Sequence, residues 1–452
     1  MNMAGIIISL FSVLFLFSLP AWAQDSYFPP ADNDQWAMQS PETLGWNTAE
    51  LDELLSWMGD RNTKAFIILK DGKLVVEQYY DFFGRDSEWY WASAGKAITA
   101  FLIGALEKQG LVGIHNPTSD YLGTGWTSLN PEEEELITLW HQLTMTTGLD
   151  YNVDDLNCTL PECLQYRRDA GEQWYYHNAP YTLLTHVAEA VADTTLNAIV
   201  NSVFESIPGL ELRYAEGGLS PFNRVVISRA LDMARFGLLI SRETAWEDNE
   251  ALLESGYYSN MLTPGQELNP SYGYLWWLNG QESFIPPGFS MPVNRSLTPE
   301  APEDMVSALG LNTQVLSIVP SRNLIVVRMG GDPGSLFAFN REKWERLSEV
   351  IGTPTSVVPP GPERPEGVQL EQNYPNPFNP STTITYHLSS AETIKLDVFD
   401  LNGRLVTTLV DGMQQAGSHH IRFDAAGLSS GLYYYRLQTS ERSIDRKMLL
   451  LR

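Results

Sequence analysis

Ser93 and Lys96 form the only Ser-x-x-Lys sequence in the chain. Residues three apart on a helix share one face, so the Lys96 amine can reach the Ser93 hydroxyl. A serine hydroxyl is a poor nucleophile until a base removes its proton, and a partly desolvated lysine can be neutral enough to serve. Ser93 also stands at the start of a predicted helix, where free N–H groups favour developing negative charge. By itself the motif is weak, and a helix-capping serine beside a solvated lysine explains it better.

A tyrosine that relays a proton to the leaving group would complete this chemistry. Three Tyr-x-Asn triplets occur, beginning at Tyr176, Tyr258 and Tyr374. The third follows a proline-rich segment, and the second is predicted to lie in a loop with no helix to fix it. The first leads directly into a long predicted helix. Tyr176 and Asn178 are therefore the expected partners of the serine and the lysine.

Helices and strands alternate irregularly around these residues. The patterns predict helices over residues 48–58, 91–106, 138–146, 181–204 and 227–241, a hairpin over 65–80 that turns at Asp71-Gly72, and late strands over 314–319 and 324–329. Strands at both ends with helices between them predict an α+β domain whose antiparallel sheet is completed by distant segments.

Several segments in order resemble the serine β-lactamase-like superfamily, which includes class C β-lactamases, penicillin-binding DD-peptidases, esterases and 6-aminohexanoate-oligomer hydrolases. The resemblance covers about residues 44–350. Beyond the two motifs above, it includes residues 137–149, which look like the family's "ITxxxLLxMTSGL" segment, and residues 272–277, Tyr-Gly-Tyr-Leu-Trp-Trp. It implies a β-lactamase/transpeptidase-like antiparallel sheet with helices.

The resemblance also implies roles for the motif residues. Ser93 would form an acyl-enzyme, with Lys96 and Tyr176 as general base and general acid. Asn178 would hydrogen-bond the carbonyl or amide side of the substrate.

The family's third motif, usually Lys-Thr-Gly or His-x-Gly on a strand beside the nucleophile, is matched by residues 307–314. By resemblance, Gly310 would let substrate approach the strand, and the Leu311 N–H would join the Ser93 N–H as an oxyanion hole. Ala308 stands where β-lactamases and DD-peptidases have a cation that helps to hold a substrate carboxylate. The absence of this cation favours a neutral ester or amide substrate.

Three functions remain open: an esterase or amidase, a DD-peptidase or β-lactamase, and a binding protein on the same fold without catalysis. The expected substrate is a small molecule or short oligomer with an ester or amide bond, and no cofactor is expected. The chain has 55 acidic and 29 basic residues, a net charge of −26. Such an acidic chain repels phosphate backbones, which disfavours nucleic acid as a partner.

The two cysteines, Cys158 and Cys163, enclose four residues. A close pair in an exported protein favours a small disulfide-closed loop. A zinc site would need further ligands, and only His141 and His177 lie near in sequence. Two unpaired thiols are the remaining alternative.

The N-terminus predicts export. Residues 6–19 are apolar apart from three serines, and Ala21-Trp22-Ala23 follows. An apolar core of this length before Ala-x-Ala is typical of a secretory signal peptide, here residues 1–23.

A proline-rich segment, residues 353–367, predicts a stiff linker between a hydrolase domain at 24–352 and a small domain at 368–452. The small domain has predicted strands over 382–388, 393–399, 417–424, 431–438 and 446–451, which indicate an immunoglobulin-like β-sandwich. Its sequence, from 372–384 through 427–436 to 447–452, resembles the type IX secretion C-terminal sorting domain. The resemblance implies recognition by that secretion machinery and a protein that is secreted or at the cell surface, reached through the periplasm. A module that binds carbohydrate or a protein partner is the alternative.

Overall fold

The computed structural model describes residues 27–217 and 221–352, and residues 369–450 except for 371, 374–375, 377, 389–390, 401–403, 416 and 440–442. The chain divides into two compact units between Thr353 and Pro354. The predicted signal peptide (1–23) and linker (353–367) lie outside the described residues.

A six-stranded antiparallel sheet forms the centre of the first unit, in the order β2-β1-β9-β8-β7-β6. Its strands are β1 (Thr63–Lys70), β2 (Lys73–Tyr79), β6 (Trp277–Leu278), β7 (Val306–Gly310), β8 (Gln314–Val319) and β9 (Leu324–Gly330). The early strand β1 pairs with the late strand β9, so distant segments complete the sheet as predicted. The β1–β2 hairpin turns at Asp71 and Gly72 with φ of 52° and 82°, the left-handed pair that a type I′ turn requires.

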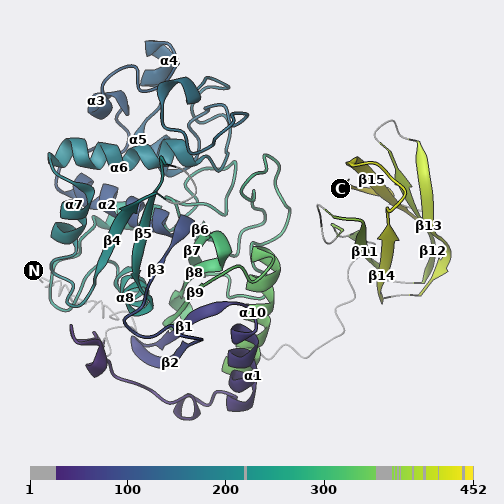
Figure 1. Cartoon of the computed structure of the whole chain (residues 1–452), viewed down its shortest axis with the longest axis horizontal. Helices are drawn as coiled ribbons and strands as arrows, with labels where there is room; N and C mark the ends of the chain where they lie inside the picture. The colour runs from purple at the N-terminus through teal and green to yellow at the C-terminus, as the bar shows by residue number, and fades with distance from the viewer. Residues whose placement is uncertain are drawn as a thin grey trace, which may run out of the picture. The chain divides into compact units, whose positions relative to one another are not determined.

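Helices cover both faces of this sheet (Figure 1). Helices α1 (Thr48–Gly59) and α10 (Leu336–Ile351) lie side by side on one face, where Phe66 and Ile68 of β1 point into their core. Helix α8 (Ala230–Ser241) packs on the other face, where Ala65 and Ile67 join a larger core shared with α2 (Lys96–Lys108). Both faces are therefore buried, which explains the nearly continuous apolar runs of the central strands.

The remaining elements of the first unit are helices, helical turns and a small sheet. They are η1 (Asn33–Gln35), η2 (Glu42–Leu44), η3 (Ala92–Gly95), α3 (Ser119–Leu122), α4 (Pro131–Glu135), α5 (Leu139–Leu143), η4 (Pro161–Cys163), α6 (Asn178–Ala192), α7 (Leu196–Val203), α9 (Ser255–Met261), η5 (Leu311–Thr313), η6 (Pro320–Arg322) and a small antiparallel sheet, β3-β5-β4, made of β3 (Glu88–Tyr90), β4 (Leu212–Glu216) and β5 (Arg224–Arg229).

Two helix predictions beyond residue 180 were wrong in extent. The predicted helix over 181–204 is two helices, because Asp193 adopts φ of 48° at the end of α6 and Thr195 caps α7 through Ala198 N–H. The predicted helix over 227–241 begins three residues later, because residues 227–229 are the end of β5 and pair with β3.

The second unit is a β-sandwich. Its two antiparallel sheets have the orders β10-β11-β14 and β13-β12-β15-β16, and side chains of both sheets share one core. The strands are β10 (Gln369–Leu370), β11 (Ser381–Leu388), β12 (Glu392–Phe399), β13 (Leu405–Gln414), β14 (Gly417–Asp424), β15 (Gly431–Gln438) and β16 (Ser443–Leu450). This confirms the predicted sandwich. The prediction missed β13, an edge strand in which no residue is fully buried, so its apolar pattern is weak.

Within the described ranges, no helix has the length and apolar character needed to cross a bilayer.

Candidate active site

Ser93 lies on a tight turn, η3, between β3 and α2. The predicted helix over 91–106 was therefore wrong at its start, since the regular helix begins only at Lys96. Ala92, directly before the serine, has φ of 48°, a left-handed conformation that costs energy for any residue with a Cβ. The neighbouring structure must hold this backbone in place.

Trp91 provides one of these attachments. Its backbone N–H donates to Val226 O at 2.8 Å, and its indole Nε1–H donates to Ser228 Oγ at 2.8 Å. Both acceptors lie on β5, and the Trp91 side chain is fully buried. The turn is thereby fastened to the small sheet one residue before its strained position.

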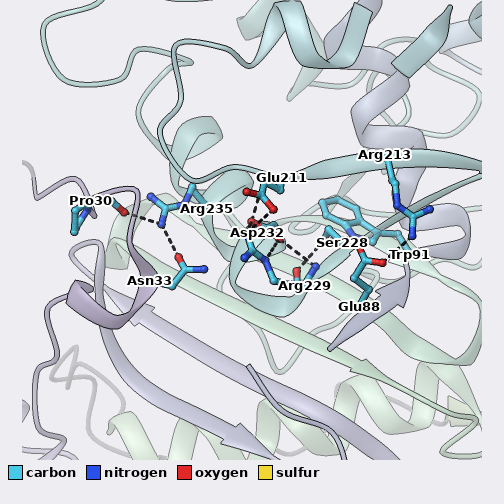
Figure 2. A network of polar contacts seen from close by, with 10 residues as sticks. All are labelled: Pro30, Asn33, Glu88, Trp91, Glu211, Arg213, Ser228, Arg229, Asp232 and Arg235. Atoms are coloured by element: carbon cyan, nitrogen blue, oxygen red, sulfur yellow. Dashed lines mark hydrogen bonds and ion pairs between the residues drawn. The ribbon is translucent and has the colours of Figure 1, made fainter. Parts of the chain in front are cut away.

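A network of polar contacts continues from Ser228 into α8 (Figure 2). Arg229 Nε lies 2.8 Å from the buried carboxylate of Asp232. Burial raises the pKa of Asp232, and the Arg229 guanidinium opposes that shift. Arg235, one turn further on, donates to Pro30 O at 3.0 Å and to Asn33 Oδ1 at 2.8 Å, as Figure 2 shows. The N-terminal segment, α8 and β5 thus form one cross-linked support.

Gly310, at the end of β7, provides the second attachment. A Cβ at this position would lie 2.3 Å from Trp91 O and 3.0 Å from Ala94 N. The glycine is therefore required because β7 approaches the backbone of the nucleophile turn. This differs from the predicted reason, which was close approach of substrate to the strand.

The structure brings Ser93, Lys96 and Asn178 together. Lys96 Nζ donates to Ser93 Oγ and to Asn178 Oδ1, each at 3.0 Å. Lys96 is almost fully buried, and this desolvation lowers its pKa well below the ordinary lysine value. Both hydrogen-bond partners are neutral side chains. The arrangement favours a neutral amine that can accept a proton.

Tyr176 also lies close to Ser93. Burial raises the pKa of its hydroxyl above the ordinary tyrosine value, and the Ser93 side chain opposes that shift by a smaller amount. The ring stacks on Trp277 with centroids 5.9 Å apart, and the Lys96 amine lies 4.6 Å from the ring centroid. Residues 272–277 therefore contribute a wall that holds the tyrosine. At neutral pH this hydroxyl is a hydrogen-bond donor.

Leu311 follows Gly310 at the start of η5, and its side chain is half-exposed. Arg328 holds this turn from inside the protein, since its Nη1 donates to Asn312 O at 2.7 Å and to Thr313 O at 3.0 Å. Asn312 Nδ2 in turn donates to the Tyr90 hydroxyl at 2.8 Å. Asn312 and Thr313 both have a φ of 58°, so η5 is a tight left-handed turn and not the start of a regular helix.

The other sequence candidates lie as follows. Ala308 is buried in β7. Cys158 and Cys163 form a disulfide. Tyr258 lies on α9, not in the predicted loop, and its hydroxyl donates to Ile240 O at 2.8 Å, whereas Tyr374 lies outside the described residues. In the ranges that the structure describes, no group of three or more His, Cys, Asp or Glu side chains could hold a metal.

Sequence reasoning missed Tyr181, whose ring centroid lies 4.0 Å from the Lys96 amine. Tyr181 is on α6, one turn after Asn178, so its spacing from the Tyr-x-Asn triplet was a usable signal. Burial raises the pKa of Tyr181 to about 12, so its ring is neutral where Lys96 titrates. The ammonium is thus flanked by two tyrosine faces.

Replacing Tyr181 with leucine is expected to lower the pKa of Lys96 by about one unit. The ring face stabilises the ammonium by about 1–2 kcal/mol in a desolvated site, and one pKa unit corresponds to about 1.4 kcal/mol. Tyr181→Phe keeps the ring and should leave the pKa unchanged. NMR titration of ¹³C-labelled lysine, assigned with Lys96→Met, measures both. An unchanged or raised pKa in Tyr181→Leu would contradict the contribution of the ring.

Comparison with known proteins agrees with this geometry. Residues 51–348 match the family described as beta-lactamase, and residues 372–450 match the secretion system C-terminal sorting domain. The first match spans the turn, both tyrosines and the β7–β8 region.

Solved structures share the fold. A putative 6-aminohexanoate-dimer hydrolase from Bacillus anthracis is 18% identical and aligns over 72% of this chain and 89% of that chain, with a TM-score of 0.53. A putative beta-lactamase from Bacteroides dorei is 18% identical over 68% of this chain and 100% of its own, with a TM-score of 0.54. A hydrolase with promiscuous acyltransferase activity, EstCE1, is 14% identical and aligns over 69% of this chain and 99% of its own, with a TM-score of 0.51. The likeness confirms the predicted β-lactamase/transpeptidase-like fold.

Proposed function

The chain belongs to the beta-lactamase family, and on that premise we propose that it is a serine hydrolase that cleaves a neutral ester or amide through an acyl-enzyme on Ser93. The observation that carries the proposal is the buried Lys96 amine, 3.0 Å from Ser93 Oγ, with a lowered pKa. A solvated lysine beside a capping serine would have neither property. The burial and the lowered pKa weigh against the alternative of a helix-capping serine beside a solvated lysine.

In the proposed reaction, Lys96 takes the Ser93 proton as Oγ bonds to the substrate carbonyl carbon. The Tyr176 hydroxyl donates a proton to the leaving oxygen or nitrogen as its bond to that carbon breaks, and regains one from the Lys96 ammonium. Water then bonds to the acyl carbon as its proton passes through the Tyr176 hydroxyl to Lys96. The Lys96 ammonium returns a proton to Ser93 Oγ as the bond between Oγ and that carbon breaks. The N–H groups of Ser93 and Leu311 would stabilise the negative charge on the carbonyl oxygen.

The surroundings of β7 support a neutral substrate. Position 308 carries alanine, whose side chain is buried, in place of the family cation. The nearby guanidinium of Arg328 is buried too and is committed to backbone carbonyls of η5. Asn178 would bind the carbonyl or amide side of the substrate. The names of two proteins with this fold, a putative 6-aminohexanoate-dimer hydrolase and a hydrolase with promiscuous acyltransferase activity, agree with acyl transfer.

The protein is exported. Its C-terminal sorting domain is an address for the type IX secretion system, which delivers proteins to the cell surface or the medium. We assign residues 1–23 to a signal peptide, 24–352 to the hydrolase domain, 353–367 to a linker and 368–452 to the sorting domain. The substrate is accordingly expected outside the cell.

A fluorophosphonate probe tests the proposal. The wild-type chain should gain the mass of one adduct on the peptide that contains Ser93, and Ser93→Ala should gain none. Ser87→Ala, six residues earlier, is the matched control and should be labelled like the wild type. Equal labelling of Ser93→Ala, or no labelling and no turnover of p-nitrophenyl esters, short amide oligomers, nitrocefin or D-Ala-D-Ala peptides by the wild type, would refute it. The same panel separates an esterase or amidase from a β-lactamase or DD-peptidase.

A further inference from the structure

The amide of Asn178, which meets Lys96, is itself held by the loop at residues 155–163. Asn178 Nδ2 donates to Asn157 Oδ1 at 2.9 Å. The Asn157 amide Nδ2 and its backbone N–H both donate to Asp155 Oδ1, at 2.8 Å and 2.9 Å. We propose that Asp155 and Asn157 are positioning residues that determine which end of the Asn178 amide faces Lys96. The inference rests on the proposed function only where it concerns reaction rate.

The direction of this row of hydrogen bonds follows from Asp155, the residue furthest from Lys96. An ionised carboxylate only accepts hydrogen bonds, so the NH₂ end of Asn157 must face Asp155. The oxygen of Asn157 is then left for Asn178, which must present its own NH₂ end in turn. The oxygen of Asn178 therefore points at the Lys96 amine, as observed at 3.0 Å. The carboxylate of Asp155 determines the orientation of the Asn157 amide, and the Asn157 amide in turn determines that of the Asn178 amide.

The loop that carries these residues is fastened at several points. Cys158 N–H donates to Asp155 O at 3.1 Å, and Ala179 N–H donates to Leu156 O at 2.8 Å. The disulfide between Cys158 and Cys163 closes the loop directly after Asn157. The loop is thus joined to the first turn of α6, and a register change between Asn157 and Asn178 would break the Ala179 contact.

The orientation of Asn178 matters for the base. A carboxamide oxygen accepts from an ammonium and so favours protonated Lys96, the form produced when Ser93 loses its proton. An NH₂ end turned toward Lys96 would instead donate to the neutral amine and lower the pKa further. The titratable groups that face Lys96 are Tyr176 and Tyr181, and burial keeps both protonated over the working range. Burial lowers the pKa of Lys96, and an NH₂ end of Asn178 turned toward the amine should lower it further.

Two variants at positions 155 and 157 and one control variant test the inference. Asn157→Leu removes the acceptor for Asn178, which can then turn its NH₂ end toward a neutral Lys96. The double variant Asp155→Asn/Asn157→Asp keeps an acceptor at position 157 and the same net charge. Asn152→Ala, an exposed asparagine of the same region, is the matched control. Each is titrated by NMR of ¹³C-labelled lysine, which requires no substrate.

We expect Asn157→Leu to lower the pKa of Lys96 by about one unit, whereas Asn152→Ala stays near the wild-type value. The exchanged double variant should stay at or above the wild-type value, because its carboxylate lies one hydrogen bond nearer the amine. In fluorophosphonate labelling, Asn157→Leu should react about tenfold more slowly, and the double variant should recover most of that loss. An unchanged pKa in Asn157→Leu, or a double variant lowered as far as Asn157→Leu, overturns the inference. A wild type that the probe does not label refutes the hydrolase proposal alone, because the titration still decides this one.

Discussion

Arginine in place of Lys96 is expected to slow acylation of Ser93 by about a thousandfold, within the range usual for loss of a general base. Arginine stays protonated in proteins, so it cannot take the serine proton. Lys96→Met removes the amine altogether and should lose as much. The second-order rate constant for fluorophosphonate labelling measures the loss, because labelling requires the same activated oxygen.

The control is Lys108→Met, at the far end of the same helix, where the lysine pairs with Glu250 on the surface. This variant should label at the wild-type rate. Near-wild-type labelling of Lys96→Met would show that another group activates Ser93.

The stability of Lys96→Met separates catalysis from misfolding. Burial lowers the folded-state pKa of Lys96 below the ordinary lysine value of 10.5, so the unfolded chain binds this proton more tightly. Wild-type stability therefore falls as pH falls below about 10.5, until the folded-state pKa is passed. Methionine has no titratable group, so Lys96→Met does not lose stability in this way. The variant should consequently be at least as stable as the wild type at neutral pH, although it is inactive.

Alanine in place of Gly310 is the second change with a large expected effect. The added Cβ would lie 2.3 Å from Trp91 O, and neither backbone atom can move without displacing the strained turn at Ala92. We expect about a hundredfold loss of labelling rate, as usual when reacting groups shift by about 1 Å. The free energy of unfolding should fall by about 1–3 kcal/mol, as in other overpacked sites.

Gly256→Ala is the matched control for this change. Gly256 lies in α9, and nothing is within 4 Å of a Cβ placed there. Chemical denaturation should show equal or slightly greater stability, since alanine is the better helix former. If Gly310→Ala also kept wild-type stability and labelling, the close approach of β7 to the nucleophile turn would not be required.

The sequence by itself determined the parts of this protein that depend on local chemistry. The Asp-Gly hairpin, the α+β order of elements and the sorting domain were all predictable, because turn residues, apolar periodicity and family segments act over short stretches. Ser93, Lys96, Tyr176 and Asn178 could be chosen from spacing and resemblance, and their catalytic roles remain predictions.

Only the tertiary structure decided how these residues are held. Trp91 is fastened to β5 through partners more than a hundred positions away, and Gly310 is small because of a backbone that is distant in sequence. Asn157 faces Asn178 across 21 positions, in a loop with no family motif. Such contacts leave no periodic signal, because each depends on where the chain returns and not on its neighbours in sequence. The burial of Lys96, which makes a weak four-residue motif chemically plausible, is likewise a property of the assembled fold.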